Sequence, residues 1–120
     1  MKHNFRELKI WQKSRILVKE IYIATLCFPD SEIYGLQNQA RRAAVSIVAN
    51  IAEGSGKGTN KDFNNFLNIA KGSLFELQTH LILSNDLDFL KTDTFNSLML
   101  QTEELVKMLV GFQAKLDKKV

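Results

Sequence analysis

The chain has 120 residues, a formal net charge of +3, 45% hydrophobic residues and 24% charged residues. This length suits one domain with a single core, and the composition excludes an intrinsically disordered chain. Residues 1–120 are therefore predicted to form one domain. The N-terminus lacks the apolar core of a signal peptide and no apolar run could span a bilayer, so we expect a cytoplasmic protein with no membrane partner.

Residues 5–27 are predicted to form the first helix. Apolar side chains recur at helical spacing, with Ile10, Leu17 and Ile21 on one face. The helix must end before Pro29, the only proline in the chain, because proline disfavours helical backbone in the residue before it.

The second helix is predicted from Gly35 to Glu53, with Gly54 as a left-handed C-terminal cap. Its core stripe consists of Leu36, Ala40, Ala43, Ala44, Ile47 and Ile51. A second apolar stripe, on another side of the helix, consists of Val45, Val48 and Ala52. A narrow polar line separates the two stripes and consists of Gln39, Arg42, Ser46, Asn50 and Glu53. A helix with two apolar sides is usually covered on both.

The third helix is predicted to begin at Thr59 or Asn60, either of which can cap it, and the fourth to begin near Asp93. Alternation with period two is never sustained, so no strand is expected. Four amphipathic helices with short connections predict an all-α fold, an antiparallel up-down-up-down four-helix bundle.

Apolar residues outside the core stripes occur on three of the four helices, and such clustering is typical of a subunit interface. The predicted homo-oligomer interface consists of Val45, Val48, Ala52, Phe75 and Ile82. The alternative is a monomer whose tilted helices enclose these side chains within a shared core.

Several short sequence motifs resemble those of a known family, and the most specific of them is Asn50-Ile51-Ala52-Glu53-Gly54. Others are Glu32-Ile33-Tyr34-Gly35-Leu36, Gln39-Ala40-Arg41-Arg42-Ala43-Ala44 and Phe66-Leu67-Asn68-Ile69-Ala70-Lys71-Gly72-Ser73. Together they resemble the four-helix-bundle family encoded in intervening sequences of bacterial 23S ribosomal RNA genes. The resemblance implies assembly into a ring, often a pentamer. The chain is also similar to the accessory protein of diversity-generating retroelements, a basic pentameric barrel that binds nucleic acid and a reverse transcriptase.

The polar line of the second helix is interpreted as a half-buried network, joined from the third helix by Ser73 and Glu76. Buried polar groups need partners whether or not a ligand exists. A structural role, in fixing helix register or subunit orientation, is therefore favoured over contact with a ligand or nucleic acid.

No residue pattern predicts catalysis, a metal or a cofactor. The loop Gly54-Ser55-Gly56-Lys57-Gly58-Thr59 fails the phosphate-loop pattern, because Ile51 stands at the first glycine position and Gly58 follows the lysine. His80 lacks neighbours at ligand spacing and is predicted to lie on a helix surface. Cys27, the only cysteine, is predicted to be a buried small hydrophobe. We expect a protein that is not an enzyme.

The positive charge is concentrated in the first half of the chain, where residues 1–61 carry ten lysines and arginines against five acidic residues. The predicted nucleic-acid contacts are Lys9, Lys13, Lys57 and Lys61. In a ring each would recur by symmetry, which favours salt-sensitive binding to an RNA or DNA backbone. The second hypothesis is a protein–protein adaptor or structural assembly protein with no nucleic-acid role.

Overall fold

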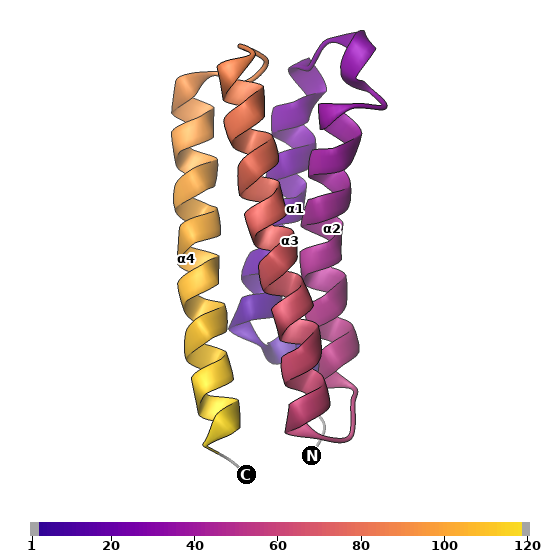
Figure 1. Ribbon diagram of the computed structural model, residues 1–120, viewed down its shortest axis with the longest axis vertical. Helices are drawn as coiled ribbons and strands as arrows, with labels where there is room; N and C mark the ends of the chain where they lie inside the picture. The colour runs from indigo at the N-terminus through magenta and orange to yellow at the C-terminus, as the bar shows by residue number, and fades with distance from the viewer. Residues whose placement is uncertain (1–2, 119–120) are drawn as a thin grey trace.

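A computed structural model, described over residues 3–118, shows four antiparallel helices arranged as a bundle (Figure 1). Their bounds are Lys9–Ala24 for α1, Leu36–Ser55 for α2, Asn60–Asp86 for α3 and Thr92–Asp117 for α4. Each helix packs on its neighbours in chain order and α4 returns to α1, which closes the bundle. The predicted up-down-up-down four-helix bundle is confirmed, and no strand occurs between residues 3 and 118.

The first predicted helix is divided into three pieces. A 3-10 turn, Phe5–Glu7, precedes α1, and a second one, Thr25–Cys27, follows it. The Thr25 hydroxyl donates to the carbonyl of Ile21 at 2.8 Å, which competes with the regular helical ladder at this point. Phe28 then adopts the extended backbone that Pro29 requires.

The turn between α2 and α3 differs from the prediction at one residue. Thr59 caps α3 as expected, and its hydroxyl accepts from the amide of Asp62 at 3.1 Å. Gly54 is not a left-handed cap, because α2 continues through Ser55 and no glycine in the described chain has a positive φ. Gly54 is buried against α3 instead, where an added Cβ would lie 2.7 Å from the Cβ of Phe66. Glycine is needed here for close helix packing, not for turn geometry.

The core lies along the bundle axis and is built from the predicted stripes. Its fully buried side chains include Leu17, Ile21, Ile47, Ile51, Phe63, Leu67, Leu74, Leu77, Leu105 and Leu109. The α2–α3 pair has the most extensive packing, and Gly54 is one point at which the two helices approach closely. No helix within residues 3–118 is long and apolar enough to cross a membrane.

The ends of the bundle carry different connections. The described chain starts and stops at one end, where the α2–α3 loop also lies (Figure 1). The opposite end holds the α1–α2 and α3–α4 connections, which meet where the Cys27 thiol points to the carbonyl of Phe89 at 3.8 Å. The molecule is elongated, with extents of 47 × 23 × 20 Å.

Candidate functional site

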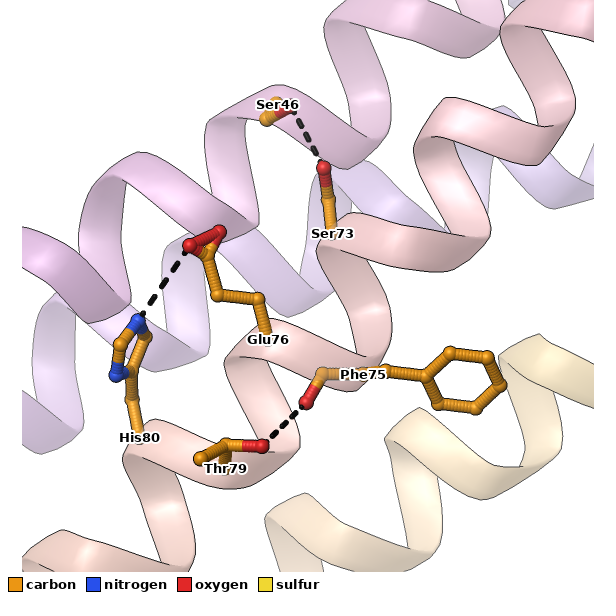
Figure 2. A network of polar contacts seen from close by, with 6 residues as sticks. All are labelled: Ser46, Ser73, Phe75, Glu76, Thr79 and His80. Atoms are coloured by element: carbon orange, nitrogen blue, oxygen red, sulfur yellow. Dashed lines mark hydrogen bonds and ion pairs between the residues drawn. The ribbon is translucent and has the colours of Figure 1, made fainter.

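The outer seam between α2 and α3 is polar. The hydroxyls of Ser46 and Ser73 are hydrogen-bonded at 2.8 Å (Figure 2). The amide of Asn50 donates to the carbonyl and the hydroxyl of Ser46, at 2.8 and 3.1 Å. The structure thus joins two residues of the predicted polar line to one from α3, and these contacts tie the helices in register. The rest of that line is exposed, and its side chains form no hydrogen bond or ion pair with the described residues: Gln39, Arg42 and Glu53.

Glu76 lies on the same seam but contacts its own helix. Its carboxylate is 3.8 Å from the Nε2 atom of His80, one turn further along α3 (Figure 2). The prediction that His80 lies on the surface is wrong, because the residue is only 9% exposed. Neither ring nitrogen of His80 is hydrogen-bonded within the described chain. A shallow polar groove of about 480 Å³ lies on this seam and is lined by Tyr34, Asn38, Gln39, Arg42, Ala43, Ser46 and Glu76.

A first apolar face covers the outer seam between α1 and α2. Arg41 marks its position, because its Nε atom donates to the Thr25 hydroxyl at 2.9 Å and its guanidinium stacks 4.4 Å from the ring centroid of Tyr22. Residues spaced by four, three and four positions share one side of a helix, so the second apolar stripe of α2 lies beside α1 as Arg41 does. We call this surface face A; it consists of Trp11, Arg15, Val18 and Tyr22 from α1 and Arg41, Val45, Val48 and Ala52 from α2.

A second apolar face covers the outer seam between α3 and α4. Gln78 donates to the Thr102 hydroxyl at 3.0 Å, which shows the side of α3 that faces α4. Phe75 and Ile82 share that side, and Figure 2 shows Phe75 pointing toward α4. They remain 52% and 43% exposed. We call this surface face B; it consists of Lys71, Phe75, Gln78 and Ile82 from α3 and Met99, Glu103, Val106 and Val110 from α4.

The predicted oligomer interface is therefore divided between two surfaces. Val45, Val48 and Ala52 belong to face A, whereas Phe75 and Ile82 belong to face B. In a bundle whose helices follow one another around the axis, the α1–α2 and α3–α4 seams lie on opposite sides. The contribution of α4 to face B was missed by sequence reasoning. The sequence does contain a pattern that indicates this contribution: Met99, Val106 and Val110 are apolar and are spaced so that they share one side of the helix.

The predicted basic contacts meet, with one exception, at the end of the bundle that holds the α2–α3 loop. Lys57 lies in that loop and Lys61 in the first turn of α3. The segment before Lys9 is tied to the same end by a hydrogen bond from the amide of His3 to the carbonyl of Ser55 at 3.2 Å. Lys57 also lies 5.1 Å from the ring centroid of Phe66. The exception is Lys13, which lies one turn further along α1 and forms an ion pair with Glu104 at 3.2 Å.

Further cations at this end were missed by sequence reasoning, because they come from segments distant in sequence. The C-terminal turn of α4 is held beside the start of α3 by hydrogen bonds from Asn60 to the carbonyl of Leu116 and from Asn64 to Asp117, at 3.3 and 2.7 Å. This placement adds Arg6, Lys115 and Lys118 to the basic end, where the acidic residues Glu7, Glu53, Asp62 and Asp117 also lie. The opposite end carries Asp30, Glu32, Asp86, Asp88 and Asp93 with Lys91. The bundle is therefore electrically polar along its axis.

The structure corrects the expected environment of Cys27. The residue is exposed, and its thiol lies 3.3 Å from the carbonyl of Ala24, because the 3-10 turn after α1 points it away from the core. Within residues 3–118, no group of three histidine, cysteine or acidic residues is placed to hold a metal ion.

Comparison with known proteins agrees with this architecture. A family model described as 23S rRNA-intervening sequence protein matches residues 6–111. A crystal structure from Bacteroides thetaiotaomicron, described as a protein with unknown function from the S23 ribosomal protein family, has 24% identity and a TM-score of 0.78, covering 87% of this chain and 97% of that chain. At that identity the likeness shows a shared fold alone, and no curated protein matches the chain. Because the family model covers most of the sequence, the chain belongs to the family of 23S rRNA-intervening sequence proteins.

Proposed function

We propose that the protein is a non-enzymatic homo-oligomer, a ring of about five copies as the sequence resemblance implies, whose basic end binds the backbone of RNA or DNA. The observation that carries the nucleic-acid role is the gathering of cations from three distant segments at one end of the bundle. These cations include three of the four lysines that the sequence singled out: Lys9, Lys57 and Lys61.

The arrangement suits recognition of phosphates better than recognition of bases. Lys9 and Lys61 are exposed and form no ion pair with the described residues, so their charges are available to an anionic partner. Exposed aromatic rings that could stack on bases are scarce at this end, where Phe63 is buried and Lys57 covers Phe66. Binding of this kind is tolerant of sequence and falls steeply with salt, by roughly 0.9 log units per tenfold salt increase for each phosphate neutralised on duplex DNA.

Oligomerisation is supported by the number and placement of exposed apolar side chains. Val45 and Phe75, from faces A and B, are 41% and 52% exposed in the isolated subunit. The subunit core therefore does not enclose them, and neighbouring copies on the two sides would bury both. Rotational symmetry would also repeat the basic end around the ring and strengthen its electrostatic potential.

The test is a salt titration of binding to a structured RNA and to duplex DNA. The variant Lys9→Gln/Lys61→Gln removes two cations from the basic end, and we expect weaker binding to both nucleic acids with a salt slope smaller by about two for each subunit that touches the backbone. The matched control Lys19→Gln/Lys91→Gln removes the same charge elsewhere and should bind like the wild type. Equal losses in both variants would show that net charge, not the basic end, drives binding.

The protein–protein adaptor is the second candidate, and a specific observation favours it. Ile23 and Leu26, which are outside faces A and B, are 58% and 72% exposed, so apolar surface would remain after the two faces are covered. Absence of nucleic-acid binding even at low salt, with the oligomer intact, would favour the adaptor and exclude the backbone-binding role.

A further inference from the structure

We infer that faces A and B are the two halves of one contact, so that face A of each copy docks on face B of the next copy in parallel orientation. This inference rests on the proposed homo-oligomer. It adds which surfaces meet and how the copies are oriented.

The position of the two faces favours a head-to-tail contact over a two-fold one. They lie on opposite sides of the bundle, so a copy bound through face A still presents face B to another copy. Contacts between unlike surfaces build rings when the rotation closes, whereas a two-fold dimer requires a surface that complements itself.

Charge makes face A a poor partner for itself. Its only ionisable side chains besides the Tyr22 phenol are Arg15 and Arg41, so two copies of face A would bring like charges together. Face B carries Glu103 as well as Lys71, and Glu103 is exposed with no ion pair among the described residues. An anion on face B can therefore meet a cation on face A.

The heights of these residues along the bundle axis agree with that pairing. The groove between these antiparallel helices is lined by residues of α1 from Lys13 to Glu20 and of α4 from Gln101 to Met108, so Lys13 is about level with Met108 and Glu20 with Gln101. At a rise of about 1.5 Å per residue, Glu103 then lies about 4.5 Å from the level of Arg15, toward the acidic end. When copies stand side by side in parallel, Glu103 of one copy is within reach of the long Arg15 side chain of the next.

The apolar residues match in the same way. Trp11 lies two residues from Lys13 and Val110 two residues from Met108, both toward the basic end, about 3 Å. Tyr22 lies two residues from Glu20 and Met99 two residues from Gln101, both toward the acidic end, about 3 Å. Parallel apposition of the two faces therefore sets apolar and aromatic side chains against one another at both ends and leaves Arg15 within reach of Glu103.

A mixing experiment tests the pairing directly, with mass measured by light scattering. Val45→Asp blocks face A, and Phe75→Asp blocks face B; both side chains are exposed, so the subunit should keep its helical circular-dichroism spectrum. Each variant alone is expected to be a single subunit at concentrations where the wild type is assembled. An equimolar mixture should form a dimer of one copy of each, because one intact A–B pair remains and growth then stops.

The opposite results overturn the inference. Variants that each dimerise alone and ignore one another when mixed would show that the faces pair with themselves. A wild-type protein that is a single subunit would exclude the contact. So would face A and face B variants that assemble as fully as an assembled wild type. Ile23→Asp, the control outside both faces, should leave the mass unchanged, and loss of assembly in that control would contradict the choice of faces. None of these readouts involves nucleic acid, so failure of the backbone-binding role would leave them unaffected.

A charge exchange provides an independent measurement if an aspartate variant fails to fold. Arg15→Glu and Glu103→Arg should each weaken assembly by roughly tenfold in dissociation constant, and the double variant should recover most of that loss. Losses that simply add in the double variant would refute the Arg15–Glu103 pairing.

Discussion

Helix α3 packs against α2 on one side and against α4 on the other. The two contacts differ in how far their outer side chains are hydrogen-bonded or buried within one subunit. On the α2 side, small residues bring the backbones together, and Ser46, Asn50 and Ser73 hydrogen-bond one another. On the α4 side, Phe75 and Ile82 extend over the seam and stay half exposed. The comparison shows that one helix can stabilise the subunit on one side and leave apolar side chains uncovered on the other. Substitutions on the two sides should therefore separate folding from assembly.

The largest effect on folding is expected at Gly54. Gly54→Val would place side-chain atoms within the space of Phe63 and Phe66, and overpacking of this kind costs about 3 kcal/mol. Urea denaturation would measure the loss. Gly111→Ala is the matched control, since nothing lies within 4 Å of the added Cβ, and it should stabilise α4 by about 0.5 kcal/mol or more. A Gly54 variant as stable as the wild type would mean that the α2–α3 packing can relax.

A smaller effect on folding is expected from the hydrogen bond across the same seam. Ser73→Ala removes one of the two partners of the Ser46 hydroxyl, the other being Asn50, and should cost about 1 kcal/mol of unfolding free energy. A double-mutant cycle with Ser46→Ala measures the coupling between the two hydroxyls. Strict additivity of the two single losses would show that the bond contributes nothing beyond each residue alone.

The smallest effect on subunit folding, within about 0.5 kcal/mol, is expected on the other seam at the exposed Phe75. Phe75→Gln should instead abolish the dependence of the melting temperature on protein concentration, because that dependence arises from the coupling of unfolding to dissociation. Differential scanning calorimetry over a hundredfold range of protein concentration would detect it. Persistence of the dependence in the variant would mean that face B does not take part in assembly.

The sequence predicted the four helices and most of the core, because both follow from local spacing and capping. Thr59 is an example, since its cap depends only on residues three positions away. Gly54 and His80 were misjudged because their environments are set by a neighbouring helix. A helical pattern alone does not reveal which residues of another helix come close.

The two apolar faces could be located only in part from the sequence, for the same reason. Spacing identified Val45 and Phe75 as lying outside the core stripes, but it does not relate the rotation of one helix to that of another. Their separation onto opposite sides required the hydrogen bonds of Arg41 and Gln78. Likewise, Lys13 forms an ion pair with Glu104 on the last helix. A count of charges along the chain does not reveal that this anion offsets the charge of Lys13.

The charge polarity of the bundle has a consequence for the energetics of a parallel ring. Aligned subunits behave as parallel dipoles that repel one another, because every basic end stands beside other basic ends and every acidic end beside other acidic ends. Salt would screen this repulsion and strengthen the association of the subunits, whereas the same salt would weaken the binding of phosphates to the ring. A polyanion bound across the basic ends would also reduce the repulsion between them. Ligand binding and ring closure would therefore each promote the other.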